Sequence, residues 1–329
     1  MASRQSFRIS SRVVLSPTQV FETYWRFAYE RQEIFYRRLA GDLQPWTDDD
    51  ILRAFRFTNV YRASDRVSQY LIRHVIYEGP QTVEEIFFRV FLFKIFNRIE
   101  TWQRLVERLN CPTWATFSFE QYDRVLSGLM RRGERIYSAA YIIPPPNLGR
   151  VRKHSNHLLL LKMMMRDRVP ARLAASRSLR EAFELLRGYP SLGDFLAFQF
   201  SIDLNYSPFL NFSEMEHVVA GPGARSGIRK AFSDTAGLCD EDVIRAVAEF
   251  ASREFAVRGL PFRSLWGRPL QLIDCQNLFC EVDKYSRVAH PAALGLGRKR
   301  IKLRFNVPKA IYDQWYPPKW GLHPRVDPT

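Results

Sequence analysis

Helical periodicity runs through most of this chain and constrains its fold more than any other feature. Residues 16–41, SPTQVFETYWRFAYERQEIFYRRLAG, begin with a Ser-Pro start signal, repeat aromatic residues every three or four positions and end on a glycine. This pattern predicts one long amphipathic helix. The clearest alternation with period two, which is typical of strands, occurs in RISSRVVL near the start and RIKLRFNV at 300–307. The fold should therefore be mainly α.

The same spacing predicts further helices and a division of the chain. The helices are expected at about 60–77, 81–98, 101–109, 118–134, 154–168, 176–188, 191–204, 224–232, 240–257 and 272–289. A Pro-rich, basic stretch at 141–156 is the expected boundary between two helical lobes. We divide the chain into a basic arm (1–15), a helical domain (16–290) and a basic tail with Pro and Trp residues (291–329). The tail is expected to be extended, and either to grip nucleic acid or to pack on the core.

Charge and composition indicate the class of partner. The formal net charge is +15, from 49 Lys and Arg against 34 Asp and Glu, which favours a polyanion such as DNA. No apolar run reaches 18 residues, so we expect no membrane association. The four cysteines and six histidines are scattered without metal-ligand spacing, so we expect no metal and no cofactor. The cytoplasm or nucleoid, or the nucleus if the source is eukaryotic, is the expected location.

Residues 178–207, SLREAFELLRGYPSLGDFLAFQFSIDLNYS, predict a helix, a tight turn and a second helix. The layout resembles the helix-hairpin-helix element of DNA glycosylases, whose turn Tyr189 and Gly193 would match, with Ser191 where that pattern has glycine. An ordinary helical hairpin is the alternative. In glycosylases the catalytic Asp follows about twenty residues later, which points to Glu216, and Asp203 is a second candidate base. Glu216 could equally cap the next helix.

A glycine-rich turn, VVAGPGARSGIRK at 218–230, suggests an anion site. It is neither a P-loop nor a dinucleotide fingerprint, because GxxxxGK[ST] is absent and the glycine spacing is one residue too long. Gly221 and Gly223 lead into a helix whose first turn carries Arg225, which suits a DNA phosphate or a pyrophosphate. A plain turn with a solvated basic face is the alternative.

Two further segments place polar residues within apolar helical patterns. On a helix beginning near Asn59, the side chains of Arg62, Asp65 and Arg66 share one face, which could face a ligand or form a salt-bridged surface. Residues 268–287 carry Asp274, Asn277, Glu281 and Lys284 among Leu, Phe and Val. That mixture suits either a polar cavity or a buried salt-bridge network.

Five phrases together resemble one family: FRFTNVYRASDRVSQYLI, FFRVFLFKIFNRIETW, YPSLGDFLAFQFSIDLNYS, GPGARSGI and LIDCQNLFCEVDKY. They are similar, in order from about residue 17 to 290, to the helical domain associated with 5-hydroxymethyluracil DNA kinases, also described as the α-glutamyl/putrescinyl thymine pyrophosphorylase family. The resemblance implies a DNA-glycosylase-like helical fold with a helix-hairpin-helix element and two helical lobes.

The resemblance also implies a role in thymine hypermodification in phages or bacteria. After a P-loop kinase pyrophosphorylates 5-hydroxymethyluracil in duplex DNA, an amino acid or polyamine displaces the pyrophosphate while the base is flipped out. A glycosylase acting on a modified base and a non-catalytic binder of modified DNA are the alternatives. The expected catalytic carboxylates are Asp203, Glu216 and Asp65. The residues expected to bind substrate or DNA are Arg56, Thr58, Asn59, Tyr61, Arg62, Arg66, Tyr189, Gly193, Asn205, Tyr206, Gly221, Gly223, Arg225, Asp274, Asn277, Glu281 and Lys284.

Overall fold

A computed structural model describes residues 6–139, 143–293, 300–306 and 313–322. It is mainly helical, as the periodicity predicts, with one small sheet. The chain forms two compact units. Unit 1 comprises Met1–Asp65, His217–Gln314 and Leu322–Thr329, and unit 2 comprises Arg66–Glu216 and Trp315–Gly321. The chain therefore passes between the units at 65/66, 216/217, 314/315 and 321/322, and the described residues 143–156 of the expected boundary lie within unit 2.

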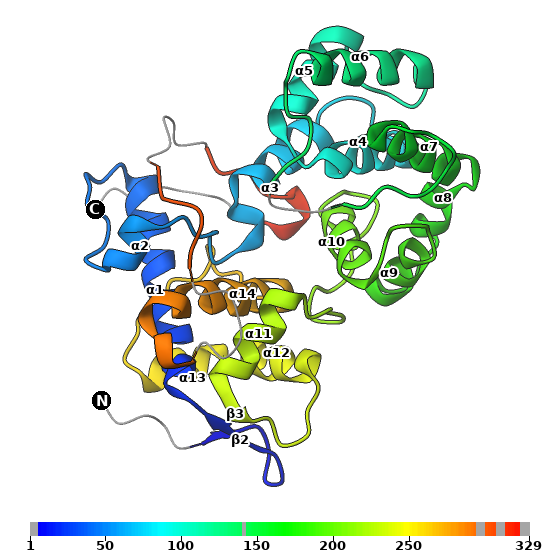
Figure 1. The fold of residues 1–329 in the computed structure, drawn as a ribbon. Coiled ribbons are helices and arrows are strands. Elements are labelled where there is room, and N and C mark those ends of the chain that lie inside the picture. The colour runs from blue at the N-terminus through cyan, green and yellow to red at the C-terminus, as the bar shows by residue number, and fades with distance from the viewer. Residues whose placement is uncertain (1–5, 140–142, 294–299, 307–312, 323–329) are drawn as a thin grey trace. The chain divides into compact units, whose positions relative to one another are not determined.

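Unit 1 combines helices from both ends of the chain (Figure 1). Its elements are β1 (Phe7–Arg8), β2 (Val14–Pro17), α1 (Gln19–Ala40), α2 (Asp50–Ala54), η1 (Arg62–Ser64), α11 (Pro222–Ala231), β3 (Phe232–Asp234), α12 (Asp240–Glu249), α13 (Ala251–Val257), α14 (Leu272–Ala289) and η3 (Pro291–Ala293). Helix α1 begins where the Thr18 side chain accepts from the Val20 amide and ends at left-handed Gly41, as its sequence predicts. Helix α14 packs against α11, α1 and α12.

Close packing of α11 on α14 explains most of the glycine-rich turn. Figure 1 shows the two helices side by side. A Cβ on Gly227 would lie 2.1 Å from the Phe279 carbonyl oxygen, and one on Gly223 would lie 2.3 Å from Cys280 Sγ. Both glycines therefore let the helix axes approach more closely than a side chain would permit. Gly221 is the N-cap residue of α11.

The N-terminal residues expected to form an arm instead contribute to a sheet. Its strand order is β1-β2-β3, and both neighbouring pairs are antiparallel. Phe7 and Leu15 are fully buried, and the Phe7 ring lies 5.2 Å from that of Phe21 on α1. The stretch RISSRVVL (8–15) thus covers the end of β1, the turn at 9–13 and the start of β2, and the buried residues of these two short strands anchor them on α1.

Unit 2 contains the central helices of the chain. Its elements are α3 (Arg66–Tyr70), the π-helix η2 (Leu71–Ile76), α4 (Val83–Phe96), α5 (Ile99–Leu109), α6 (Phe119–Arg131), α7 (Lys153–Arg166), α8 (Val169–Ala174), α9 (Leu179–Arg187), α10 (Asp194–Asn205) and η4 (Pro318–Trp320). Helix α4 is buried on nearly every side and contacts α7, α8, α10 and η2. A helix that is apolar all round suits this central position.

The structure differs from the predicted helices in three places. The predicted helix at 60–77 is a 3-10 turn, a short α-helix and a π-helix, and Arg89 of α4 donates to the carbonyls of Val75 and Ile76 in the last of these. The predicted helix at 240–257 divides at Phe250 into α12 and α13. Helix α8, which periodicity does not predict, follows left-handed Arg168 with a proline in its first turn.

Helices α9 and α10 pack together across the turn at 188–193, so the predicted helix, turn and helix are present. Ser191, at the position where the glycosylase pattern has glycine, has a positive φ of 67°. Glycine adopts that conformation more readily than serine. At this position the chain therefore has a backbone conformation that glycine favours, although the residue is serine. The helix-hairpin-helix and glycosylase-like assignments stay predictions.

The described parts of the tail pack on the core. Leu303 O accepts from the Arg56 amide at 3.0 Å, and Phe305 N donates to Ala54 O at 3.1 Å. Of the strand predicted at 300–307, the described residues 300–306 form only a short bridge. Farther on, Lys319 donates to the carbonyls of Asn205, Ser207 and Leu210. None of the helices within the described ranges combines the length and apolar character needed to cross a bilayer.

Candidate functional site

The loop at 56–65 and helix α14 are held together by carboxylates in unit 1. Glu281 Oε2 accepts from the Thr58 amide at 3.0 Å, and Asp274 Oδ1 accepts from the Arg62 amide at 2.8 Å. Lys284 also binds Glu281 Oε2, at 2.6 Å. Two segments that the sequence analysis selected, more than 200 residues apart, thus form one polar cluster. The acids of α14 accept from two backbone amides of the loop, of which that of Arg62 is buried.

Asp65 closes this loop and is the one carboxyl group within residues 56–65. Its Oδ1 accepts from the Asn59 amide at 2.8 Å, and the residue is partly exposed. Burial raises the pKa of Asp65 to about 6, against the opposing effects of the Asn59 hydrogen bond and the Arg31 charge. A carboxyl group with this pKa exchanges protons near neutral pH, which suits a general base.

Arg31 of α1 connects the loop to a pocket. Its Nη2 donates to Asn59 Oδ1 at 2.7 Å, and the residue is only 7% exposed. Burial, followed by the charge of Arg38, lowers the pKa of Arg31 to about 10. Among the described residues, no atom accepts a hydrogen bond from Arg31 Nη1. A buried guanidinium with a free donor is costly unless an anion satisfies it.

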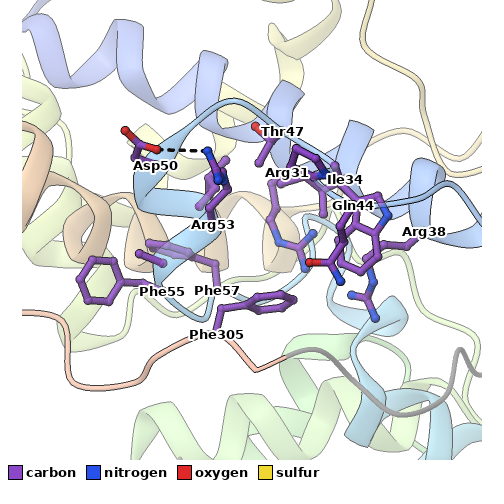
Figure 2. A pocket seen from close by; sticks show the side chains of 14 residues that line it. Arg31, Ile34, Arg38, Gln44, Thr47, Asp50, Arg53, Phe55, Phe57 and Phe305 are labelled. Carbon is purple, nitrogen blue, oxygen red and sulfur yellow. Dashed lines mark hydrogen bonds and ion pairs between the residues drawn. The ribbon is translucent and has the colours of Figure 1, made fainter.

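The pocket has a volume of about 650 Å³, within the usual size range for small-molecule sites. Figure 2 shows residues that line it. They are Arg31, Ile34, Arg38, Gln44, Pro45, Trp46, Thr47, Asp50, Leu52, Arg53, Ala54, Phe55, Phe57 and Phe305. All belong to unit 1, and Phe305 reaches the pocket because residues 303–305 pair with 54–56.

Aromatic rings and guanidinium groups dominate the chemistry of this pocket. Trp46, Phe55, Phe57 and Phe305 supply rings, and the Trp46 and Phe305 ring centres lie 6.4 Å apart. Arg38 lies over the Trp46 ring, with Cζ 5.3 Å from the ring centre. Arginine with aromatic faces suits a ligand that combines a planar ring with negative charge.

Several other expected site residues in unit 1 have identified contacts. Tyr61 is buried, and its hydroxyl donates to Arg268 O at 2.8 Å. Arg225 is half-exposed, and its Nε donates to Ala220 O, while Asp240 lies 3.8 Å away. Glu241 accepts from the Ala220 amide just before α11, so a carboxylate already lies near this helix start. Arg56 is exposed, and Asn277 is partly buried on α14.

The expected site residues of α10 lie in the interior of unit 2. Asp203 is fully buried and forms an ion pair with Lys94 of α4, with Nζ and Oδ2 2.9 Å apart. Asn205 exchanges two hydrogen bonds with the backbone of Phe212. The Tyr206 carbonyl accepts from the Tyr77 hydroxyl at 3.1 Å. These contacts connect α10 to its neighbours and account for the polar residues in its sequence.

The remaining expected residues lie around α9. Glu216 accepts from the Leu179 and Arg180 amides at 3.2 and 3.5 Å, at the start of α9. The sequence left open a cap on the next helix, but Glu216 lies at the start of α9, which precedes it in the chain, where a carboxylate suits the helix N-terminus. The Tyr189 hydroxyl donates to Asp167 at 3.0 Å, and Gly193 is the N-cap of α10. Arg66 is exposed, 4.0 Å from Glu100.

The sequence analysis did not identify the pocket residues Arg31, Arg38, Trp46 and Phe305. One signal was present for two of them: Arg31 and Arg38 are seven residues apart in the long helix, which places both on one face. No local pattern connects Phe305 to this helix. Within the described ranges, no three His, Cys, Asp or Glu side chains gather in a way that could hold a metal ion.

Comparisons with known proteins identify relatives. The family model described as "5-hmdU DNA kinase, helical domain" matches residues 18–295. A 5-hmdU DNA kinase of Bacillus phage SP10 is 25% identical over 289 residues, which cover 81% of this chain and 45% of the relative. The chain thus spans less than half the length of this relative. No solved structure matches the chain.

Proposed function

Because the chain belongs to the family of the 5-hmdU DNA kinase helical domain, we propose that it modifies 5-hydroxymethyluracil in DNA. The reaction is displacement of pyrophosphate from the pyrophosphorylated base by an amino acid or polyamine. No GxxxxGK[ST] motif occurs within these 329 residues, so we assign the pyrophosphorylation itself to a P-loop kinase that lies outside them. The net charge of +15 supports a DNA partner in the cytoplasm or nucleoid.

The proposed step forms one bond and breaks one bond. The amine nitrogen attacks the methylene carbon on the pyrimidine, and the carbon–oxygen bond to pyrophosphate breaks, with its electron pair leaving on pyrophosphate. The attacking nitrogen then loses a proton to a carboxylate base. The reaction thus needs a base that is ionised near neutral pH and cations that stabilise the leaving group.

The observation that carries the proposal is the connection between Asp65 and the pocket. Asp65 has a pKa of about 6, and its Oδ1 binds the Asn59 amide, while the Asn59 side chain binds Arg31, which lines the pocket. A proton acceptor and a guanidinium are therefore joined by two hydrogen bonds. We assign the base to Asp65 because of this connection to the pocket, whereas Asp203 forms an ion pair with Lys94 and Glu216 accepts from the start of α9.

The test incubates purified protein with duplex DNA containing pyrophosphorylated 5-hydroxymethyluracil and a pool of amines, followed by digestion to nucleosides and mass spectrometry. We expect an amine-bearing nucleoside and release of pyrophosphate. Asp65→Asn keeps a hydrogen-bond acceptor for the Asn59 amide but loses the base, so its rate should fall by about 10²- to 10⁴-fold. Glu216→Gln is the matched carboxylate control and should retain the activity.

The outcomes separate the alternatives. Unchanged nucleosides without pyrophosphate release would refute the transferase and leave a binder of modified DNA. Abasic sites would identify a glycosylase. Equal loss of activity in Asp65→Asn and Glu216→Gln, with both variants folded, would refute the assignment of the base to Asp65.

A further inference from the structure

We propose that the pocket beside α1 binds a pyrimidine ring that carries a phosphate or pyrophosphate group, with Arg31 Nη1 donating to the anion and Phe57 and Phe305 contacting the ring. That the ring is a flipped base of DNA rests on the proposed function. The presence of an anion and ring site is argued from the contacts of the pocket itself.

The anion contact follows from the geometry of Arg31. This side chain is 93% buried, and Asn59 fixes its Nη2 at 2.7 Å. Figure 2 shows its guanidinium pointing from α1 toward the side of the pocket where Phe57 and Phe305 lie. The bond from Nη2 to Asn59 orients the guanidinium, and Nη1 meets no acceptor among the described residues. Because Nη1 is already removed from water, a ligand that binds it adds no further desolvation cost for this donor.

A second guanidinium extends the positive character of the same wall. Arg38 follows two turns later on α1 and also lines the pocket. Its Nε is buried, and no described atom accepts from it. Two arginines on one face repel each other in the absence of an anion; burial is the larger cause of the lowered pKa of Arg31, and the charge of Arg38 is the second. A doubly or triply charged phosphate group would remove that repulsion.

The ring contact follows from the opposite walls. Phe57 is 8% exposed and held by Tyr285, whose ring centre lies 6.0 Å away, so it provides a fixed apolar surface. Phe305 is positioned by the hydrogen bond from its amide to Ala54 O. Residue 305 lies beyond the 18–295 match, so this wall is a feature of the present chain that the family comparison does not describe. We therefore assign Phe305 a role in ligand specificity.

The test measures binding, not turnover. Isothermal titration of the full chain uses two probes: inorganic pyrophosphate, and 5-(phosphonomethyl)uracil, a stable analogue without a leaving group. Arg31→Lys should weaken both probes by about 10- to 100-fold, because a charged hydrogen bond is lost. Phe305→Ala should weaken the uracil analogue by about tenfold and leave pyrophosphate unchanged. Arg263→Lys, a half-exposed arginine paired with Glu33, is the control and should bind both probes normally.

Each outcome decides one part of the proposal. The proposal is overturned if the wild-type protein does not bind the uracil analogue, or if Arg31→Lys, shown to be folded by circular dichroism, binds as tightly as wild type. Binding of pyrophosphate with no gain from the uracil ring would overturn the ring contact. Arg31-dependent binding without any modified nucleoside in the turnover assay would retain the site and refute the proposed function. Full turnover by Arg31→Lys would retain the proposed function and refute the assignment of the anion contact to Arg31.

Discussion

Replacing Gly227 by alanine tests the packing of α11 against α14. The added Cβ would lie 2.1 Å from Phe279 O and 2.8 Å from its carbonyl carbon, both backbone atoms of α14. A normal contact of about 3.4 Å requires the helices to separate by roughly 1.3 Å. Overpacking lowers the free energy of unfolding by about 3 kcal/mol at the upper end of its usual range. The higher helix propensity of alanine raises it by about 1 kcal/mol. The expected net loss is about 2 kcal/mol.

Thermal unfolding followed by circular dichroism measures this effect. For a unit of this size, the loss should lower the midpoint by about 4–8 °C. Gly128→Ala is the matched control, because its nearest atoms are flexible ends of Arg132 and Arg131 at 3.6 and 4.0 Å. It should raise stability by up to about 1 kcal/mol through helix propensity alone. A Gly227→Ala midpoint equal to wild type or above it would refute the close-packing argument.

Four further results are expected. The folded-state pKa of Asp65, about 6, is above the unfolded value of about 4, so its contribution to stability is complete below about pH 4 and is lost as pH rises through about 6. As the pH rises from about 4 to 6, wild type should lose stability in thermal unfolding relative to Asp65→Asn. A difference in stability between the two proteins that does not change with pH would contradict the raised pKa of Asp65. Asp203→Asn leaves Lys94 buried without its counter-charge and should cost about 3–5 kcal/mol in urea unfolding, whereas wild-type stability would exclude a buried ion pair. Glu216→Gln should lose about 0.3–1 kcal/mol in the same assay by weakening the start of α9, and no loss would argue against the cap. Affinity for duplex DNA, measured by fluorescence anisotropy, should fall at least about tenfold between about 50 and 200 mM salt if arginines contact phosphates, and a flat response would refute this.

Local sequence signals predicted much of the secondary structure. Helix α1 begins after Thr18 and ends at Gly41, as predicted, because a side-chain cap and a left-handed glycine act within one turn of the helix. The apolar run of α4 predicted burial, although it could not show which helices surround it. Prediction failed where a distant group decides the backbone, as in the π-helix, whose carbonyls bind Arg89.

The site was predicted in part for the same reason. The polar residues of the loop at 56–65 and of α14 were recognisable, because charged groups in an apolar pattern need partners, and these two segments do contact each other. The glycines at 221–227 were equally visible, but a glycine that permits a phosphate and one that permits a neighbouring helix look identical in sequence.

The sequence by itself determined the helical class, most helix bounds, the family and the positive charge, because these follow from spacing and composition over short distances. Only the tertiary structure decided which polar residues meet. The pocket unites Arg31 with Phe305, separated by more than 270 residues, whereas Asp203 and Glu216 belong to the other unit. Whether a carboxylate acts as a base, a helix cap or half of an ion pair depends on its burial and its partners. Tertiary packing sets both, and local periodicity predicts neither.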